Sequence, residues 1–312
     1  MGTVEKNFSQ ELVDRLKDGI TNIYTNGAYQ AYLDTMMRFP TYSARNCALI
    51  QMQCPEATQV AGMRKWETDF ERKVRKGERA IRILAPAPYK ELKEYVVQDE
   101  SGDIVVGQDN HIKTEMREIE RIGFKVAYVF DLSQTEGKEL PEIIHPLKDT
   151  VEDYEKVKAA FEAAAPCKVV YGKIRGGANG LYSIRKKLIA IQEDMGQTQT
   201  LKTLIHEIAH AYLHDPEGGL MPGVDRRTKE VQAESIAYVT CGRLGLDTSD
   251  YSFGYIAGWS SGKEAKELVA SSEVIKKQAD SIYEKICQKL GLEAEIKAEP
   301  LKLKSDSFKA VM

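Results

Sequence analysis

The chain has 312 residues, 42% of them hydrophobic and 29% charged, with a formal net charge of −3 at pH 7. This length is more than one core commonly organises and predicts two domains, and the composition is typical of a soluble globular protein. The acidic balance excludes a chain that is basic throughout, although it permits a basic face on part of the surface.

No apolar segment has the length of a signal-peptide core or of a membrane span, so we expect a cytoplasmic protein with no membrane partner. The cysteines are odd in number, scattered, and never arranged as a CxxC pair: Cys47, Cys54, Cys167, Cys241 and Cys287. This pattern predicts neither a disulfide framework nor a thiolate zinc site.

Two helices are predicted near the N-terminus. Residues 8–39 carry apolar side chains at three-to-four spacing, with Ser9 as a plausible N-cap and Pro40 as the stop. Residues 42–55 predict a second, shorter helix that Pro55 closes.

Strands are predicted next. Residues 59–70 and 79–86 alternate in polarity around a turn at Gly77, and residues 126–130 predict a further strand. Between them, the charged residues 90–118 contain several turn signals and predict an exposed insertion.

The expected fold class is α+β with two domains: a mixed α/β N-terminal domain, then a small sheet packed on two helices. Residues 136–148 contain two prolines and little periodicity, which favours a boundary there. In the second domain we expect a helix at 151–165 and strands at 167–172 and 180–192. The predicted parts are residues 1–140, residues 141–285 and a tail at 286–312.

The segment TLIHEIAHAYLH, residues 203–214, contains three of the five histidines. On a helix capped by Thr198 or Thr200, His206 and His210 are four residues apart, so both imidazoles leave one face and can bind a single zinc ion. Glu207 flanks that face and can act as the general base of an HExxH peptidase. The zinc would lower the pKa of a water molecule and polarise the scissile carbonyl.

A catalytic zinc needs a third protein ligand. The segment KEVQAESIAY places Glu230 and Glu234 on one helix face, four residues apart, next to buried positions. One carboxylate would ligate zinc and the other would accept a hydrogen bond from the far nitrogen of a ligating histidine. We assign Glu230 as the ligand and Glu234 as its partner, and the reverse assignment stays open.

Other interpretations of these segments exist. The HExxH residues could lie on a solvated helix face without any metal. His214 is too far along the helix to share the ion with His206, and we expect it to contact free helix carbonyls or to line the cleft. Residues 180–192 suit an edge strand that pairs with an extended peptide, or an ordinary edge strand that its charges protect.

A basic surplus with interleaved aromatic residues marks the first domain. Such a combination can neutralise phosphates and stack unpaired bases, as in single-strand-binding proteins, although a solvated charged hairpin has the same composition. The candidate nucleic-acid-binding residues are Tyr42, Arg64, Lys65, Trp66, Arg72, Lys73, Arg75 and Lys76.

Two resemblances extend these interpretations. Residues 8–135, with TYSARNCALIQMQCPEATQVAGMRKWETDFERKVRKGERAIRILAP, resemble the single-stranded-DNA-binding domain of ArdC-type antirestriction proteins of conjugative elements. The second part, with TLIHEIAHAYLH and KEVQAESIAY, is similar to the zinc metallopeptidase half of those proteins and to ImmA/IrrE-type metallopeptidases.

The resemblance implies a zincin fold for the second domain, with His206, His210 and Glu230 as zinc ligands and Glu207 as catalytic base. ImmA/IrrE-type proteins often have Asn or Asp where this chain has Glu234. Two functions follow as hypotheses: a zinc-dependent endopeptidase that acts on an unidentified protein and also binds single-stranded DNA, or a non-enzymatic protein that protects single-stranded DNA, in which the zinc domain is structural.

Overall fold

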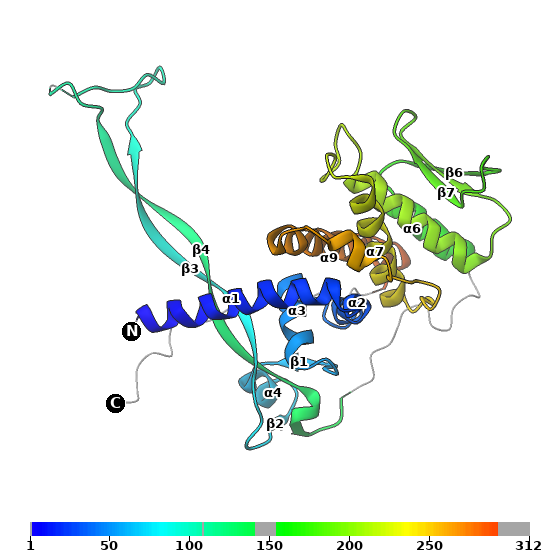
Figure 1. The fold of residues 1–312 in the computed structure, drawn as a ribbon, viewed down its shortest axis with the longest axis horizontal. Coiled ribbons are helices and arrows are strands. Elements are labelled where there is room, and N and C mark those ends of the chain that lie inside the picture. The colour runs from blue at the N-terminus through cyan, green and yellow to red at the C-terminus, as the bar shows by residue number, and fades with distance from the viewer. Residues whose placement is uncertain (1, 108, 141–153, 293–312) are drawn as a thin grey trace.

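The structure, a computed structural model, describes residues 2–107, 109–140 and 154–292. These residues form a helical body, small sheets at its margins and one long β ribbon that projects away from the helices (Figure 1). The mixture of helices and small sheets agrees with the predicted mixed α/β composition. None of the described helices is long and apolar enough to cross a bilayer.

The N-terminal helices follow the predicted periodicity with one break. They are α1 (Gly2–Thr25), α2 (Tyr29–Arg38) and α3 (Ala44–Gln53). The single helix predicted over 8–39 is interrupted at Gly27, whose φ of 75° is a backbone conformation that ends helices. Because α1 begins upstream of Ser9, the predicted cap is wrong. The third helix ends before Pro55, as predicted.

Two small antiparallel sheets follow. Their elements are β1 (Val60–Ala61), α4 (Met63–Thr68), β2 (Arg72–Val74), β3 (Ile81–Val96), β4 (Thr114–Asp131), the 3-10 helix η1 (Leu132–Gln134) and β5 (Thr135–Gly137). One sheet has the order β1-β4-β3, and β2 pairs with β5 in the other.

The strand predicted over residues 59–70 is mostly wrong. Only β1 is extended, and α4 replaces the rest. Trp66 on α4 packs against Phe70, just beyond the end of the helix, with ring centroids 5.0 Å apart, and this packing favours a helical turn over an extended strand. Trp66 also packs with Phe130 of β4 in a small apolar cluster.

The ribbon of β3 and β4 pairs continuously from Ile81 opposite Val129 to Val96 opposite Thr114. Its inner end is buried against the body, whereas every described side chain over residues 86–125 is exposed or half-buried. The segment 90–118, predicted as an exposed insertion, forms the outer ribbon and its tip.

The remaining elements are α5 (Tyr154–Ala164), β6 (Lys168–Gly172), β7 (Gly180–Ser183), β8 (Leu188–Gln192), α6 (Gln197–Leu213), α7 (Arg226–Leu244), α8 (Ile256–Ser260) and α9 (Ala265–Leu290). The strand predicted over 180–192 is two strands, because the chain turns between Ser183 and Leu188, where Lys187 has a φ of 48°. The central strand β8 pairs in parallel with β6 and antiparallel with β7, so β7 is an edge strand.

One buried core joins the N-terminal helices to α7 and α9. Buried tyrosine hydroxyls fix this contact: Tyr24 lies 2.8 Å from Ser272 Oγ, and Tyr29 lies 2.8 Å from Ser235 Oγ. The parts predicted as residues 1–140 and 141–285 therefore pack against each other. The predicted boundary at 136–148 lies mostly outside the described residues, and so does the predicted tail beyond residue 292, whereas residues 286–290 continue α9.

Candidate metal centre

Helix α6 presents the HExxH residues. Its buried face carries Leu201, Leu204, Ile205 and Ile208, which anchor it in the core. The N-cap is Gly196, and Thr200 donates its hydroxyl back to the Gly196 carbonyl, so neither predicted threonine caps the helix. The side of α6 opposite this buried face carries His206 and His210, which face α7.

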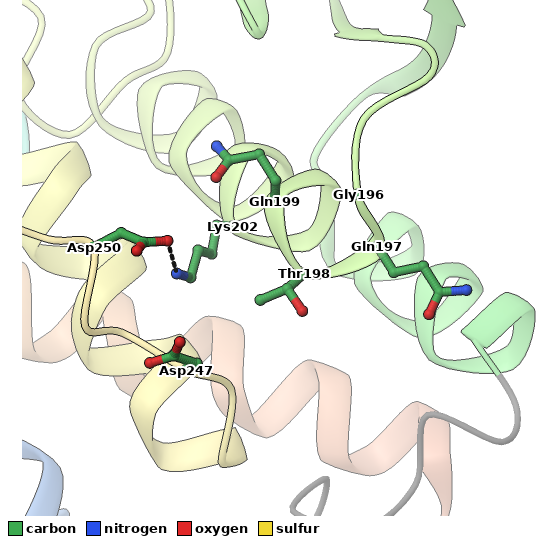
Figure 2. A pocket seen from close by; sticks show the side chains of 7 residues that line it. All are labelled: Gly196, Gln197, Thr198, Gln199, Lys202, Asp247 and Asp250. Atoms are coloured by element: carbon green, nitrogen blue, oxygen red, sulfur yellow. Dashed lines mark hydrogen bonds and ion pairs between the residues drawn. The ribbon is translucent and has the colours of Figure 1, made fainter.

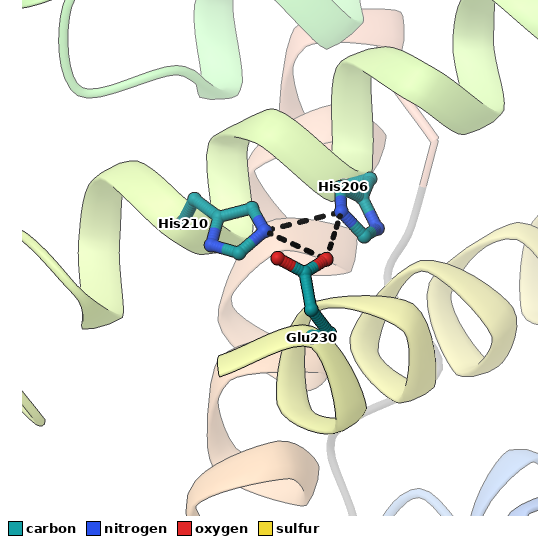
Figure 3. Close-up of side chains that lie close together, drawn as sticks. All are labelled: His206, His210 and Glu230. Atoms are coloured by element: carbon teal, nitrogen blue, oxygen red, sulfur yellow. Dashed lines mark hydrogen bonds and ion pairs between the residues drawn. The ribbon is translucent and has the colours of Figure 1, made fainter. Parts of the chain in front are cut away.

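Glu230 completes a three-residue cluster with His206 and His210 (Figure 3). It lies near the start of α7, whose N-cap Asp225 accepts a hydrogen bond from the Thr228 backbone N–H. The Nε2 atoms of the two histidines are 3.1 Å apart, and Glu230 Oε2 lies 3.5 Å from His206 Nε2 and 3.7 Å from His210 Nε2.

These separations suit a tetrahedral zinc site. Two atoms that each lie 2.0–2.1 Å from one tetrahedral zinc are about 3.3 Å apart, close to all three distances in the cluster. Two imidazole nitrogens and one carboxylate oxygen are also donors that zinc accepts. The donor set and its spacing therefore fit the ion that the sequence predicts.

Glu234 has a different partner from the predicted one. Its carboxylate accepts a hydrogen bond from the Tyr255 hydroxyl, whereas His210 Nδ1, the far nitrogen of that histidine, lies 2.9 Å from His214 Nδ1. Glu234 lies one helical turn beyond Glu230, so its side chain reaches the loop before α8. The hydrogen bond predicted between Glu234 and a ligating histidine is not seen for His210.

The electrostatics separate the two acidic groups of the site. The adjacent imidazoles of His206 and His210 hold the pKa of Glu230 well below its usual range, which keeps a carboxylate facing them. Burial raises the pKa of Glu207, although the two histidines oppose the shift. A carboxylate with a raised pKa is closer to the range that suits a general base.

His214 is not the surface residue that its place at the helix end suggests. It is buried, and its Nε2 lies 2.9 Å from the side-chain oxygen of Gln232 on α7. Burial lowers its pKa to about 4, so the ring is neutral near neutral pH. The prediction that it contacts free helix carbonyls is wrong, because the paired position on α7 cannot be read from α6 alone.

The edge strand β7 lies directly against Glu207. A Cβ built at Gly180 would meet Glu207 Cγ at 2.9 Å and Thr203 Cγ2 at 2.6 Å. A hydrogen bond from the Tyr182 backbone also acts on the Glu207 carboxylate. The candidate base therefore lies between the metal cluster and the edge strand that was predicted to accept a peptide.

A second network ties β7 to the end of α6. Asp215 accepts hydrogen bonds from the Tyr182 hydroxyl and from Lys187 Nζ, the latter at 2.7 and 2.8 Å. Lys187 and then Tyr182 hold the pKa of Asp215 well below its usual range. Periodicity does not indicate this network, since it predicts one continuous strand and no turn between Ser183 and Leu188.

A polar cavity of about 490 Å³ lies at the start of α6 (Figure 2). The side chain of Lys202 points into it, 3.3 Å from Asp250, one helical turn before His206. The cavity lining does not include the metal cluster: Gly196, Gln197, Thr198, Gln199, Lys202, Asp247 and Asp250. It lies beside the candidate centre along the same helix.

Only some of the residues predicted to bind nucleic acid are exposed enough to do so. Trp66 has no exposed surface and donates its indole N–H to the Phe130 carbonyl, so it cannot stack a base and this prediction is wrong. Tyr42 is half-buried and donates its hydroxyl to the Val60 carbonyl.

The predicted basic residues fall into two groups. Arg72 bonds Thr135 and the Lys138 carbonyl, and Arg75 bonds Glu78 and the Ser133 carbonyl. Four of the basic side chains are exposed: Arg64, Lys65, Lys73 and Lys76.

Comparison with known proteins relates the first part of the chain to an antirestriction family. Residues 3–130 match the family described as the N-terminal domain of anti-restriction factor ArdC. An uncharacterized protein of Bacillus anthracis is 27% identical over 314 residues, which cover 91% of this chain and 52% of that protein. The chain thus spans about half the length of this relative.

Two crystal structures of the antirestriction ArdC protein from the R388 plasmid also align. The metal-free structure has a TM-score of 0.49 and 16% identity, and the alignment covers 86% of this chain and 98% of that chain. The Mn(II)-bound structure has a TM-score of 0.48 and 14% identity, with 82% and 97% covered.

Proposed function

We propose that the chain is a zinc-dependent endopeptidase whose N-terminal part binds single-stranded DNA. The observation that supports the peptidase is the convergence of His206, His210 and Glu230 at 3.1–3.7 Å, with a buried glutamate beside them at an edge strand. Structural zinc sites use four protein ligands and catalytic sites three. The described residues offer three here, which favours the catalytic interpretation over a structural zinc.

Each residue has a distinct part in hydrolysis. The bound ion would polarise the scissile carbonyl and lower the pKa of a water molecule to about 7. Glu207 accepts the proton of the attacking water on its carboxylate and passes it to the departing amine. The free edge of β7 provides backbone donors and acceptors that align an extended peptide next to Glu207.

Glu207→Gln tests the catalytic assignment. The amide keeps the size of the side chain and leaves the ligands in place but cannot accept the proton, so we expect hydrolysis of unfolded, labelled casein to fall by roughly 10²–10⁴-fold. Zinc content should not change. Glu217→Gln is the matched control, because that carboxylate is 80% exposed and forms an ion pair with Lys187. A Glu207→Gln variant as active as wild type would rule out the assigned base.

The DNA-binding proposal rests on the match of residues 3–130 to the ArdC N-terminal domain and on the exposed cations. The structure changes the choice of residues that could act. Since Trp66 is buried, Tyr128, which is 58% exposed, is the better candidate for stacking. Its backbone lies against Gly62, two residues before Arg64.

Charge reversal on the full chain tests this proposal. We expect Lys65→Glu, Lys73→Glu and Lys76→Glu together to weaken binding of single-stranded oligonucleotides of any sequence. The log–log salt dependence should become shallower by about 0.7 for each lost phosphate contact. Arg72 and Arg75 are left unchanged because their loss would disturb β2 and β5. Salt-independent binding in an anisotropy titration, or equal affinity for duplex DNA, would contradict the proposal.

A further inference from the structure

We propose that His214 and Gln232 are positioning residues that select the tautomer of His210 in which Nε2 carries a lone pair facing the metal centre. The inference rests on the metal centre of the proposed function and concerns residues that do not touch the ion. It assigns a role to a relay of hydrogen-bonded side chains that crosses three helices and consists of His210, His214, Gln232 and Ser271.

The relay runs from α6 through α7 to α9. His210 Nδ1 lies 2.9 Å from His214 Nδ1, and His214 Nε2 lies 2.9 Å from Gln232 Oε1. Gln232 Nε2 then lies 3.2 Å from Ser271 Oγ. His214, Gln232 and Ser271 are at most 5% exposed, so water does not compete for these bonds.

The direction of each bond follows from its neighbour. The amide oxygen of Gln232 can only accept, so His214 donates from Nε2–H. A neutral imidazole has a single N–H, which leaves His214 Nδ1 as an acceptor. His210 must therefore donate from Nδ1–H, and its Nε2 is the unprotonated nitrogen.

That unprotonated nitrogen is the atom that the metal centre requires. His210 Nε2 lies 3.1 Å from His206 Nε2 and 3.7 Å from Glu230 Oε2. With the amide of Gln232 reversed, every bond would reverse, and a proton on Nε2 would block the ligand position. The orientation of one buried amide therefore controls whether His210 can bind the ion.

Nitrogen-15 NMR of the metal-free full chain, at mildly alkaline pH, measures the tautomer directly. We expect His210 to carry its proton on Nδ1 in the wild type and to lose this preference in Gln232→Met. A wild-type His210 with its proton on Nε2 would overturn the inference. This measurement does not depend on peptidase activity.

Zinc affinity, measured by competition with a chelator, gives the second test. Loss of a partner of a ligating histidine typically lowers metal affinity by about 10–100-fold, and we expect this for Gln232→Met and His214→Phe. His214→Asn should restore much of it, because its amide oxygen can accept from His210 Nδ1. Ser272→Ala is the matched control, a buried α9 serine that bonds Tyr24 instead of the relay.

The outcomes separate the two proposals. Unchanged zinc affinity in folded Gln232→Met would overturn the relay while leaving the metal centre in place. Failure of the wild type to bind zinc would overturn the proposed function, and the tautomer measured in the metal-free chain would still decide the inference.

Discussion

Glu207 packs against the neighbouring strand β7 at Gly180, a residue with no side chain. Gly180 leaves room that a methyl group would fill, because an added Cβ would lie 3.0 Å from Glu207 Oε1 as well as 2.6 Å from Thr203 Cγ2. A contact under 3.0 Å with the middle of a buried side chain requires that side chain to move. The position of the candidate base is therefore coupled to β7.

Gly180→Ala should displace Glu207 and lower peptide hydrolysis by about 10-fold or more, since small shifts of catalytic groups are costly. Zinc content should stay at the wild-type value because His206 and His210 face Glu230 of α7. Gly172→Ala in β6 is the control, since a Cβ there meets nothing within 4 Å. Wild-type hydrolysis by Gly180→Ala, measured with the same casein substrate, would show that Glu207 is not held in this way.

Residue spacing predicted the cluster of His206, His210 and Glu230 because each of these residues lies on a helix with a recognisable periodicity. His206 and His210 share one face of α6, and Glu230 lies in the first turns of the next helix. The partners that orient this cluster could not be predicted in the same way. Gln232 reaches His214 only through the packing of α7 on α6, and Trp66 is buried by Phe130, 64 residues further along the chain.

At the scale of elements, the edge strand β7 is held by charge. The Lys187 and Tyr182 side chains converge on Asp215, just beyond α6, and so tie the strand to the end of the helix. Periodicity predicted one strand here, but the turn needs Lys187 in a left-handed conformation that no local pattern of polarity indicates. Because the predicted strand is divided in two, β7 becomes an edge strand beside Glu207.

The outer part of the β3–β4 ribbon projects away from the helical body (Figure 1). Residues 86–124 carry nine acidic and five basic side chains, which makes this segment a poor surface for phosphates. The prolines at 86 and 88 remove backbone donors from β3, which protects that edge against strand pairing.

We expect that replacing residues 90–120 with Asn-Gly, joining Tyr89 to its partner Arg121, leaves the rest of the fold intact. Zinc content and single-stranded DNA affinity should be unchanged, and the melting temperature should shift by no more than about 3 °C. Elemental analysis, anisotropy and a thermal melt check this. Loss of zinc from the shortened chain would show that the ribbon supports the core.

At the scale of the whole molecule, the parts predicted as separate domains share a core. Tyr238 donates to Asp34 at 2.6 Å, and Lys276 donates to the Pro40 carbonyl at 2.8 Å, so partly buried polar contacts join the two parts. Composition and length predicted the two parts, but contacts between distant segments determine how they pack. Functional tests of either part therefore belong on the full chain.

The proposed function depends on a zinc site built by His206, His210 and Glu230. Elemental analysis of purified chain, after equilibration with equal zinc and manganese, tests it most directly. We predict about one zinc per chain in the wild type and in Glu234→Ala, and none in His206→Ala or Glu230→Ala. A wild type without metal, or a Glu230→Ala variant that keeps zinc while Glu234→Ala loses it, would contradict the site described here.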